Sequence, residues 1–240
     1  MEIDFNNSKP ILIAGPTASG KSALGIDLAQ RFNGVVINAD ALQVYSQWHV
    51  LTARPSAEEI ELCPHRMYGH IDIGAPYSAG HWLADVRKAL VAAAEDGLRP
   101  IILGGTGLYF QLLTNGIAEI PEIPSEIKHQ ADIIEKTDGK HAFAALLREL
   151  DPNTLLRIDH LNPVRTRRAW EVIAATGKGL SRWQEETPPP LLEIEECIGV
   201  NLVSEADWLN ERIERRFDNM IDAGALGECQ SVLDASLWDE

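Results

Sequence analysis

One octapeptide near the start of the chain has the residue types and the spacing of a phosphate-binding loop. It runs Gly15-Pro16-Thr17-Ala18-Ser19-Gly20-Lys21-Ser22 and fits the pattern G-x-x-x-x-G-K-[ST]. The glycines let the backbone curl until several N–H groups face one anion, and a helix that begins at the loop adds partial positive charge. We expect Lys21 to meet terminal phosphate oxygens and Ser22 to offer its hydroxyl to Mg²⁺. The loop predicts a polyphosphate or pyrophosphate site and leaves the bound molecule open.

Two further candidate residues follow apolar segments that we predict to be buried strands. Asp40 comes after residues 35–38, and Thr106 lies in the glycine-rich run that follows residues 101–103. Because ligands of open α/β sheets bind outside the carboxyl ends of the strands, both side chains are expected beside the loop. Asp40 could hold Mg²⁺ through water, accept a proton from a nucleophile, or only cap a turn. Thr106 could bind a second anionic centre.

A pair of arginines lies on the last long helical segment. Arg212 and Arg216 are four residues apart and share one face of the predicted helix. Two guanidinium groups on one side suit a pyrophosphate. The alternative is surface pairing with Glu211 and Glu214, which the residues alone favour.

The same segment carries signals for its own boundaries and burial. A box-like Ser204-x-x-Asp207 pattern predicts that the helix begins at Ser204. Apolar residues at helical spacing predict a buried stripe made of Leu209, Ile213, Phe217 and Met220.

The elements that must position these residues predict an α/β fold with an insertion. Residues 1–116 alternate apolar strands and amphipathic helices, which predicts a P-loop NTPase-like parallel sheet flanked by helices. Residues 117–190 show helical patterns only, which predicts an inserted helical domain. Residues 191–240 are expected to return to the core. The expected strands are 11–14, 35–38, 101–103 and 197–203, and the expected core helices are 22–32, 79–96 and a segment beginning near 108.

Composition limits the class of protein. The 240 residues carry a formal net charge of −15, which argues against general nucleic-acid binding, although residues 157–182 hold six cations and two anions. Three dispersed cysteines predict reduced thiols rather than a metal site or a disulfide framework. The sequence shows neither a secretory signal nor an apolar stretch of membrane-spanning length. We therefore expect a cytoplasmic protein.

Five strings in the chain together resemble the tRNA dimethylallyltransferase family, the isopentenyl transferases of adenosine beside the anticodon. They occur in the family's order and span nearly the whole chain. They are the phosphate loop, Asn38-Ala39-Asp40-Ala41-Leu42-Gln43-Val44-Tyr45, Gly104-Gly105-Thr106-Gly107-Leu108-Tyr109, Arg168-Ala169-Trp170-Glu171-Val172 with Thr176-Gly177, and Arg212-Ile213-Glu214-Arg215-Arg216-Phe217 with Met220 and Gly224.

The resemblance implies roles for the candidate residues. The phosphate loop, residues Gly15 to Ser22, would hold the pyrophosphate of dimethylallyl diphosphate, although it looks like a nucleotide site. Thr106 and Arg216 would contact that pyrophosphate, with Mg²⁺ at Ser22. Asp40 would bind the adenine N6 amine and act as base. Asp40, Thr106 and Arg216 are thus the predicted catalytic set for alkyl transfer.

The resemblance also implies that the helical insertion grips a tRNA anticodon loop, in a protein that we expect to be monomeric. The residues it assigns to tRNA are Asp40, Ala41, Leu42, Gln43, Lys128, Val164, Arg165, Thr166, Arg167 and Arg168. The chain departs from the family's usual pattern at Ala41, at Val164 and in the loop of residues 48–53.

Other interpretations remain at this point. The same phosphate loop would serve a nucleoside or small-molecule kinase that uses ATP. The family normally continues past the position of Glu240, so an inactive, truncated phosphate-binding module is a third interpretation.

Overall fold

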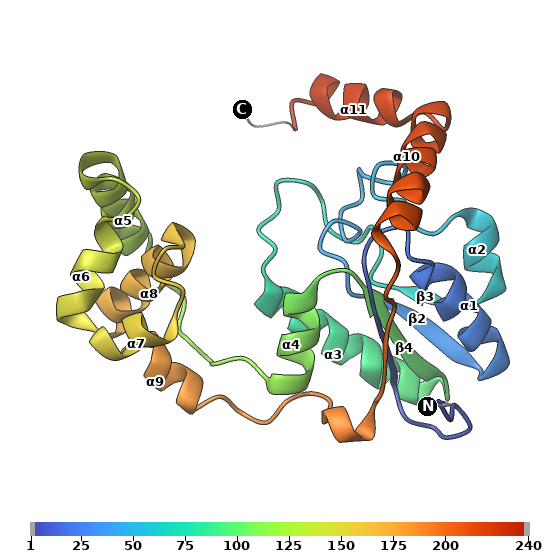
Figure 1. The fold of residues 1–240 in the computed structure, drawn as a ribbon, viewed down its shortest axis with the longest axis horizontal. Helices are drawn as coiled ribbons and strands as arrows, with labels where there is room; N and C mark the ends of the chain where they lie inside the picture. Colours follow the sequence, from blue (N-terminus) through green and yellow to red (C-terminus); the bar gives the residue numbers. More distant parts are fainter. Residues whose placement is uncertain (1–2, 238–240) are drawn as a thin grey trace. The chain divides into compact units, whose positions relative to one another are not determined.

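The computed structural model describes residues 3–237 and contains a five-stranded sheet in the order β3-β2-β4-β1-β5 (Figure 1). Every pairing is parallel. The strands are β1 (Ile11–Ala14), β2 (Gly34–Asn38), β3 (His65–Arg66), β4 (Arg99–Gly104) and β5 (Ile198–Asn201). The helices of the same part are α1 (Lys21–Arg31), α2 (Ala57–Leu62), α3 (Ala79–Glu95), α4 (Gly107–Asn115), the 3-10 turn η1 (Ile194–Glu196), α10 (Ala206–Asp222) and α11 (Ala225–Asp234).

The register of the sheet brings three strand ends to one edge. Ala14 of β1 is paired with Gly104 of β4, and Asn38 of β2 is paired with Leu103 of β4. Because the strands are parallel, the segments that follow β1, β2 and β4 all leave the sheet on the same side. The fold therefore gathers the phosphate loop, Asp40 and Thr106, as an α/β interpretation of the sequence requires.

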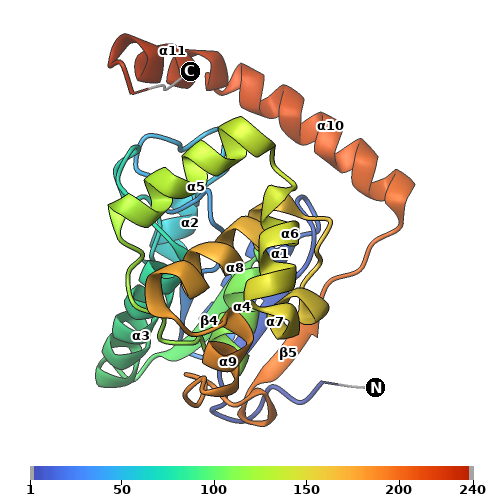
Figure 2. The same cartoon turned by 90° about the vertical axis from the view of Figure 1, so that its left-hand side faces the viewer.

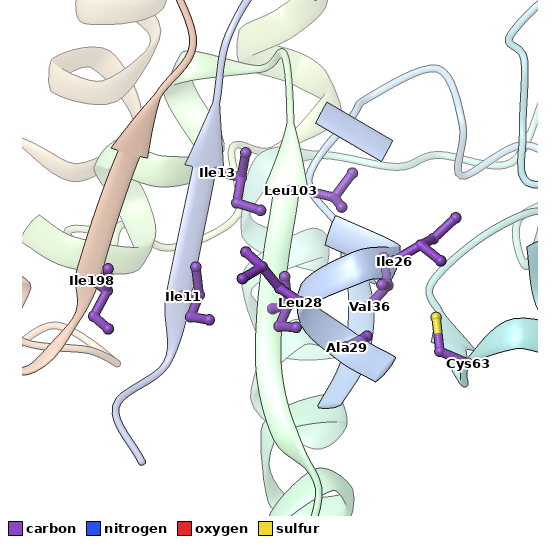
Figure 3. Close-up of a cluster of buried hydrophobic side chains, with 10 residues drawn as sticks. Ile11, Ile13, Ile26, Leu28, Ala29, Val36, Cys63, Leu103 and Ile198 are labelled. Atoms are coloured by element: carbon purple, nitrogen blue, oxygen red, sulfur yellow. The ribbon is translucent and has the colours of Figure 1, made fainter. Parts of the chain in front are cut away.

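The sheet is held by a core of branched aliphatic side chains between β1, β4, β2 and α1 (Figure 3). Ile11, Ile13 and Ile101 are fully buried on neighbouring strands. Gly25 of α1 lets the helix come close to the sheet, since a Cβ there would lie 2.3 Å from Leu103 Cδ2. Close packing of α1 fixes the helix N-terminus, and with it the phosphate loop, against the end of β1.

The chain divides into two compact units. One joins the residues up to Asn115 with those from Pro190 onward, and the other is Gly116–Pro189. The second unit is helical and contains α5 (Ser125–Asp138), α6 (Ala142–Leu150), α7 (Pro152–Arg157), α8 (Pro163–Thr176) and α9 (Leu180–Glu185). Its core is built around Phe143 and Trp170, whose ring centroids are 5.6 Å apart.

The chain enters and leaves the helical unit through adjacent segments. Within the first unit, the Leu192 amide donates to the Leu113 carbonyl at 3.1 Å. Within the second, a Cβ on Gly116 would lie 2.6 Å from the Pro188 carbonyl oxygen. Gly116 also has a φ of +79°, which a side chain would make strained.

Three expectations about local structure were wrong. Residues 55–76, which the expected strands and helices do not include, contain α2 and β3, and α2 begins with a capping box between Ser56 and Glu59. Helix α10 begins at Ala206 with Glu205 as its N-cap and no side-chain cap, so the Ser204 box does not form. None of the residues of α10 is buried: Phe217 is 58% exposed. The spacing of the stripe was correct, but the described core does not cover that face.

None of the helices in the described part of the chain is long and apolar enough to cross a membrane.

Candidate active site

The phosphate loop is a tight turn whose backbone needs unusual conformations. Gly20, at the N-cap of α1, has a φ of +94°, and Ala18 has a φ of +58°. Lys21 Nζ donates to the Pro16 carbonyl at 2.6 Å, so the lysine bends back over its own loop. The Ser19 hydroxyl is buried and has no hydrogen-bond partner among residues 3–237. A curled loop with an unsatisfied hydroxyl at a helix N-terminus is suited to an anion.

Asp40 is held in place by the residues around the end of β2. Asn38 Oδ1 accepts from the Asp40 amide at 2.9 Å, and Asn38 Nδ2 donates to the Asp40 carbonyl at 3.0 Å. Asp40 Oδ1 accepts from the Leu42 amide at 2.9 Å. The ring of Trp82 fixes this turn from behind by donating from Nε1 to the Asn38 carbonyl at 3.0 Å. The carboxylate is thus positioned before any ligand arrives.

Thr106 supports the same turn from β4. Its hydroxyl accepts from the Ala41 amide at 3.0 Å, and its amide donates to the Ala39 carbonyl at 3.3 Å. The two turns approach so closely that a Cβ on Gly104 would lie 2.0 Å from the Ala39 oxygen. In this structure Thr106 therefore braces the segment that carries Asp40. Its direct contact with a pyrophosphate stays a prediction.

A cavity of about 440 Å³ opens where these elements meet. Its polar wall includes Thr17, Lys21, Ser22, Asp40 and Arg216, which come from the phosphate loop, the start of α1, the end of β2 and α10. Its apolar lining includes Ile26, Val36, Leu51, Pro55, Leu103, Ile213, Phe217 and Met220. One cavity thus combines cationic and acidic groups with an apolar surface.

The charged groups of this cavity interact electrostatically. Burial lowers the pKa of Lys21, Asp40 opposes that shift, and the neighbouring Arg216 adds to it. Burial also lowers the pKa of Arg216, and Asp40 again opposes the shift. Both cations are half-buried, and Arg216 repels Lys21. Binding of an anion with more than one negative charge would therefore stabilise the charged forms of both side chains.

Arg212 contributes to the site from behind the phosphate loop. Its Nε donates to the Ala18 carbonyl at 2.8 Å, and its guanidinium lies 4.7 Å from the centre of the Trp208 ring. The structure therefore directs Arg212 to the loop backbone and Arg216 into the cavity. Surface pairing with neighbouring glutamates does not describe this geometry.

The residues assigned to tRNA in the first unit lie next to Asp40. Leu42 is 63% exposed, and Ala41 is partly exposed. Gln43 faces inward, where its Nε2 donates to the carbonyls of Thr52 at 2.8 Å and Ala53 at 2.9 Å. Only the exposed members present a surface to a macromolecule, and Gln43 instead holds a cavity-lining segment.

The residues assigned to tRNA in the helical unit also include both exposed and buried side chains. Lys128, Val164, Arg165 and Arg168 are exposed. Thr166 is 1% exposed, and its hydroxyl donates to backbone carbonyls of its own helix. A buried threonine cannot touch an RNA directly.

Arg167 is engaged by carboxylates of the same unit. It reaches Asp132 at 2.6 Å, Glu135 at 2.7 Å and Glu171 at 2.9 Å. Hydrogen bonds to Asp132 first, and then to Glu171 and Glu135, raise the pKa of Arg167. With three anions on one guanidinium, Arg167 ties α5 to α8, and it has little capacity left for a phosphate.

The segment of residues 49–54 overlaps the loop in which the chain departs from the family's usual pattern, and it was not among the predicted site residues. Leu51, Thr52, Ala53 and Arg54 line the cavity, as does Tyr68 after β3. Burial, followed by the nearby Asp40, raises the pKa of Tyr68. The segment has no regular pattern of apolar residues, and one of its anchors, Glu228, lies far along the chain, so its place in the cavity wall depends on the fold.

Comparison with known proteins agrees with this architecture. A parallel sheet with a phosphate loop after β1 places the chain in the P-loop NTPase-like class. Models of two families match it: "IPP transferase" over residues 43–239 and "Isopentenyl transferase" over residues 9–74. The chain belongs to the tRNA dimethylallyltransferase family, and it is a prenyltransferase.

Individual relatives cover nearly all of the chain. The tRNA dimethylallyltransferase of Cereibacter sphaeroides (strain ATCC 17025 / ATH 2.4.3) is 53% identical over 96% of this chain and 76% of that protein. The tRNA dimethylallyltransferase of Dinoroseobacter shibae is 50% identical over 96% of this chain and 75% of that protein.

Solved structures give the same result. A eukaryotic dimethylallyltransferase acting on tRNA has a TM-score of 0.81 at 30% identity, over 95% of this chain and 56% of that one. The full-length tRNA isopentenylpyrophosphate transferase from Bacillus halodurans has a TM-score of 0.62 at 29% identity, over 97% and 72%. These likenesses confirm the predicted fold class and the family resemblance.

Proposed function

We propose that this chain transfers a dimethylallyl group from dimethylallyl diphosphate to N6 of the adenosine beside the anticodon of tRNA and releases diphosphate. The observation that carries the proposal is the single cavity in which Lys21, Arg216 and Asp40 meet beside an apolar wall. The cations suit a diphosphate, the wall suits a five-carbon prenyl group, and the carboxylate suits an amine. The kinase interpretation has no comparable use for the apolar wall.

The reaction is a displacement at an allylic carbon. The N6 nitrogen forms a bond to C1 while the C1–oxygen bond breaks, and its electron pair leaves with the diphosphate. Asp40 accepts the proton that N6 loses. Lys21 and Arg216 stabilise the negative charge that develops on the leaving group, which lowers the barrier.

Mg²⁺ fits this site only as a partner of the diphosphate. No group of three His, Cys, Asp or Glu that could hold a metal exists among the residues the structure describes. The Ser22 hydroxyl on the cavity wall and the oxygens of a bound diphosphate would supply the ligands. When bound, the ion would add positive charge on the leaving group.

In this proposal the target base leaves its stack to reach Asp40, as a base does when an enzyme modifies it within a folded nucleic acid. We assign the grip on the anticodon loop to the exposed side chains of the helical unit, with Lys128, Arg165 and Arg168 as phosphate contacts. We infer that the protein acts as a monomer in the cytoplasm, where unmodified tRNA is found.

The test is a transfer assay with labelled dimethylallyl diphosphate, Mg²⁺ and unmodified tRNA. Label should enter tRNA and should disappear with Arg216→Ala. AMP as acceptor and ATP as donor are the controls for a small-molecule prenyltransferase and for a kinase. Diphosphate binding with no transfer to any acceptor, or ATP consumption with no prenyl transfer, would overturn the proposal.

A further inference from the structure

One carboxylate from the last helix lies on the backbone of a segment far away in the sequence. Glu228 of α11 accepts hydrogen bonds from three consecutive amides, those of His49 at 2.5 Å, Val50 at 3.0 Å and Leu51 at 2.9 Å. Both carboxylate oxygens take part. Three N–H groups that converge on one point form an anion site, and here the anion is supplied by the chain itself.

The segment that Glu228 holds forms part of the cavity wall. Residues 51–54 line the cavity directly after these three amides. Gln43 donates to the carbonyls of Thr52 and Ala53, and Arg54 Nη2 donates to the Ser46 carbonyl at 3.2 Å. Glu228 thus satisfies the donors of the segment, while Gln43 satisfies its acceptors.

The helices that carry Glu228 have little apolar burial of their own. None of the residues of α10 is buried, and in α11 only Ala225 and Val232 are buried. Figure 2 shows α10 and α11 as two successive helices that extend from the end of β5. Yet α10 delivers Arg216 and Phe217 to the cavity. Specific polar contacts must therefore contribute strongly to the placement of these helices.

Two such contacts bracket the helix pair. Arg212 of α10 donates to the phosphate loop at Ala18, and Glu228 of α11 accepts from residues 49–51. The first contact fixes α10 beside the loop that receives the diphosphate. The contact of Glu228 holds α11 against residues 49–51, next to the apolar lining that would contact the prenyl group of the donor.

We infer that Glu228 is a positioning residue of the active site. It joins the cavity-lining segment 49–54 to the α10–α11 pair, so that Leu51 and the α10 side chains face the donor in a fixed arrangement. Glu228 touches neither substrate and acts through the backbone that it holds. This inference rests on the proposed function, because it gives the positioned wall the task of binding the prenyl donor.

The test uses the full chain with Glu228→Ala and Glu228→Gln, and Gln230→Ala as the matched control. Gln230 is an exposed residue of the same helix whose side chain donates to Asp234 in its own helix. Hydrogen exchange measured without substrate should accelerate about tenfold or more at the amides of residues 49–51 in Glu228→Ala. Glu228→Gln keeps one acceptor oxygen and should show an intermediate acceleration.

The kinetic consequence is a selective one. In Glu228→Ala the KM for dimethylallyl diphosphate should rise about tenfold, while kcat stays within about threefold, because the reacting groups remain and the wall around the donor loosens. Gln230→Ala should change neither quantity. A protein that was only destabilised would lose active fraction, and hence kcat, without a change in KM.

The possible outcomes decide between separate claims. Unchanged exchange at residues 49–51 in both variants, or an unchanged KM with accelerated exchange, would overturn the positioning role. If Glu228→Ala does not fold, Glu228→Gln carries the same test. If the wild-type protein transfers no prenyl group while exchange responds as expected, the anchoring of residues 49–51 by Glu228 stands, and the proposed function and its donor-binding consequence fall.

Discussion

Asp40→Asn removes the proposed base while leaving its support intact. The Asp40 side chain accepts from the Leu42 amide through Oδ1, and an asparagine oxygen can accept the same hydrogen bond. The bonds from Asn38 involve only the backbone of residue 40. The variant should therefore fold with a free energy of unfolding close to that of the wild type.

The expected loss of activity follows from the lost proton acceptor. General-base catalysis contributes about 10²–10⁴-fold, so kcat should fall by that factor, which corresponds to about 3–5 kcal/mol of activation free energy. Binding of the donor should respond in the opposite direction. Asp40 is a negative charge near Lys21 and Arg216. Its neutralisation removes a repulsion for diphosphate, so the KM for the donor should stay constant or decrease.

The assay is the initial rate of label transfer into saturating tRNA at several concentrations of donor. Asp27→Asn is the matched control, because Asp27 is a carboxylate of α1 that pairs with Arg31 on the surface. The control should retain the wild-type rate. A fall in kcat of less than about tenfold for Asp40→Asn, with the fold unchanged, would refute a base at this position.

Four further perturbations test the packing of the two units, the surface of the helical unit and the titration of the site. Gly104→Ala should destabilise the protein by about 1–3 kcal/mol in urea unfolding, since its Cβ would meet a carbonyl oxygen at 2.0 Å, whereas Gly107→Ala meets open space and serves as control. Arg167→Ala should cost about 2–4 kcal/mol because it strips three carboxylates of their partner. Exposed Arg165→Ala should change stability by less than about 0.5 kcal/mol and weaken tRNA binding instead. Finally, burial lowers the pKa of Lys21, so kcat/KM for the donor should fall as pH rises through a value below that of a free lysine, and Lys21→Arg should move the fall to higher pH.

The parts of the fold that the sequence predicts well are those with strong periodic signals. The segments around Ile13, Val36 and Ile102 are apolar strands bounded by glycine or asparagine, and the structure has strands there. The octapeptide and the acidic residue after the second strand likewise meet at one edge. In each case a local pattern and the rule for parallel sheets agree.

The parts that sequence reasoning missed depend on contacts between distant residues. β3 has two residues, and its place in the sheet comes from pairing with Val36 and Ile37 rather than from its own composition. The apolar spacing of α10 predicts one face of a helix but not what covers it, and Phe217 remains exposed. Glu228 binds backbone amides, which every residue type except proline would offer at positions 49–51, so the side-chain types there could not reveal this contact.

The two segments that connect the sheet to the helical unit contact each other at Leu113 and Leu192 and again at Gly116 and Pro188. The segments that enter and leave the helical unit contact each other where they join the first unit. The distance that the chain must cover to bring β5 beside β1 therefore does not grow with the size of the helical unit. A change in the length of the helical unit therefore leaves the register of β5 against β1 unaltered.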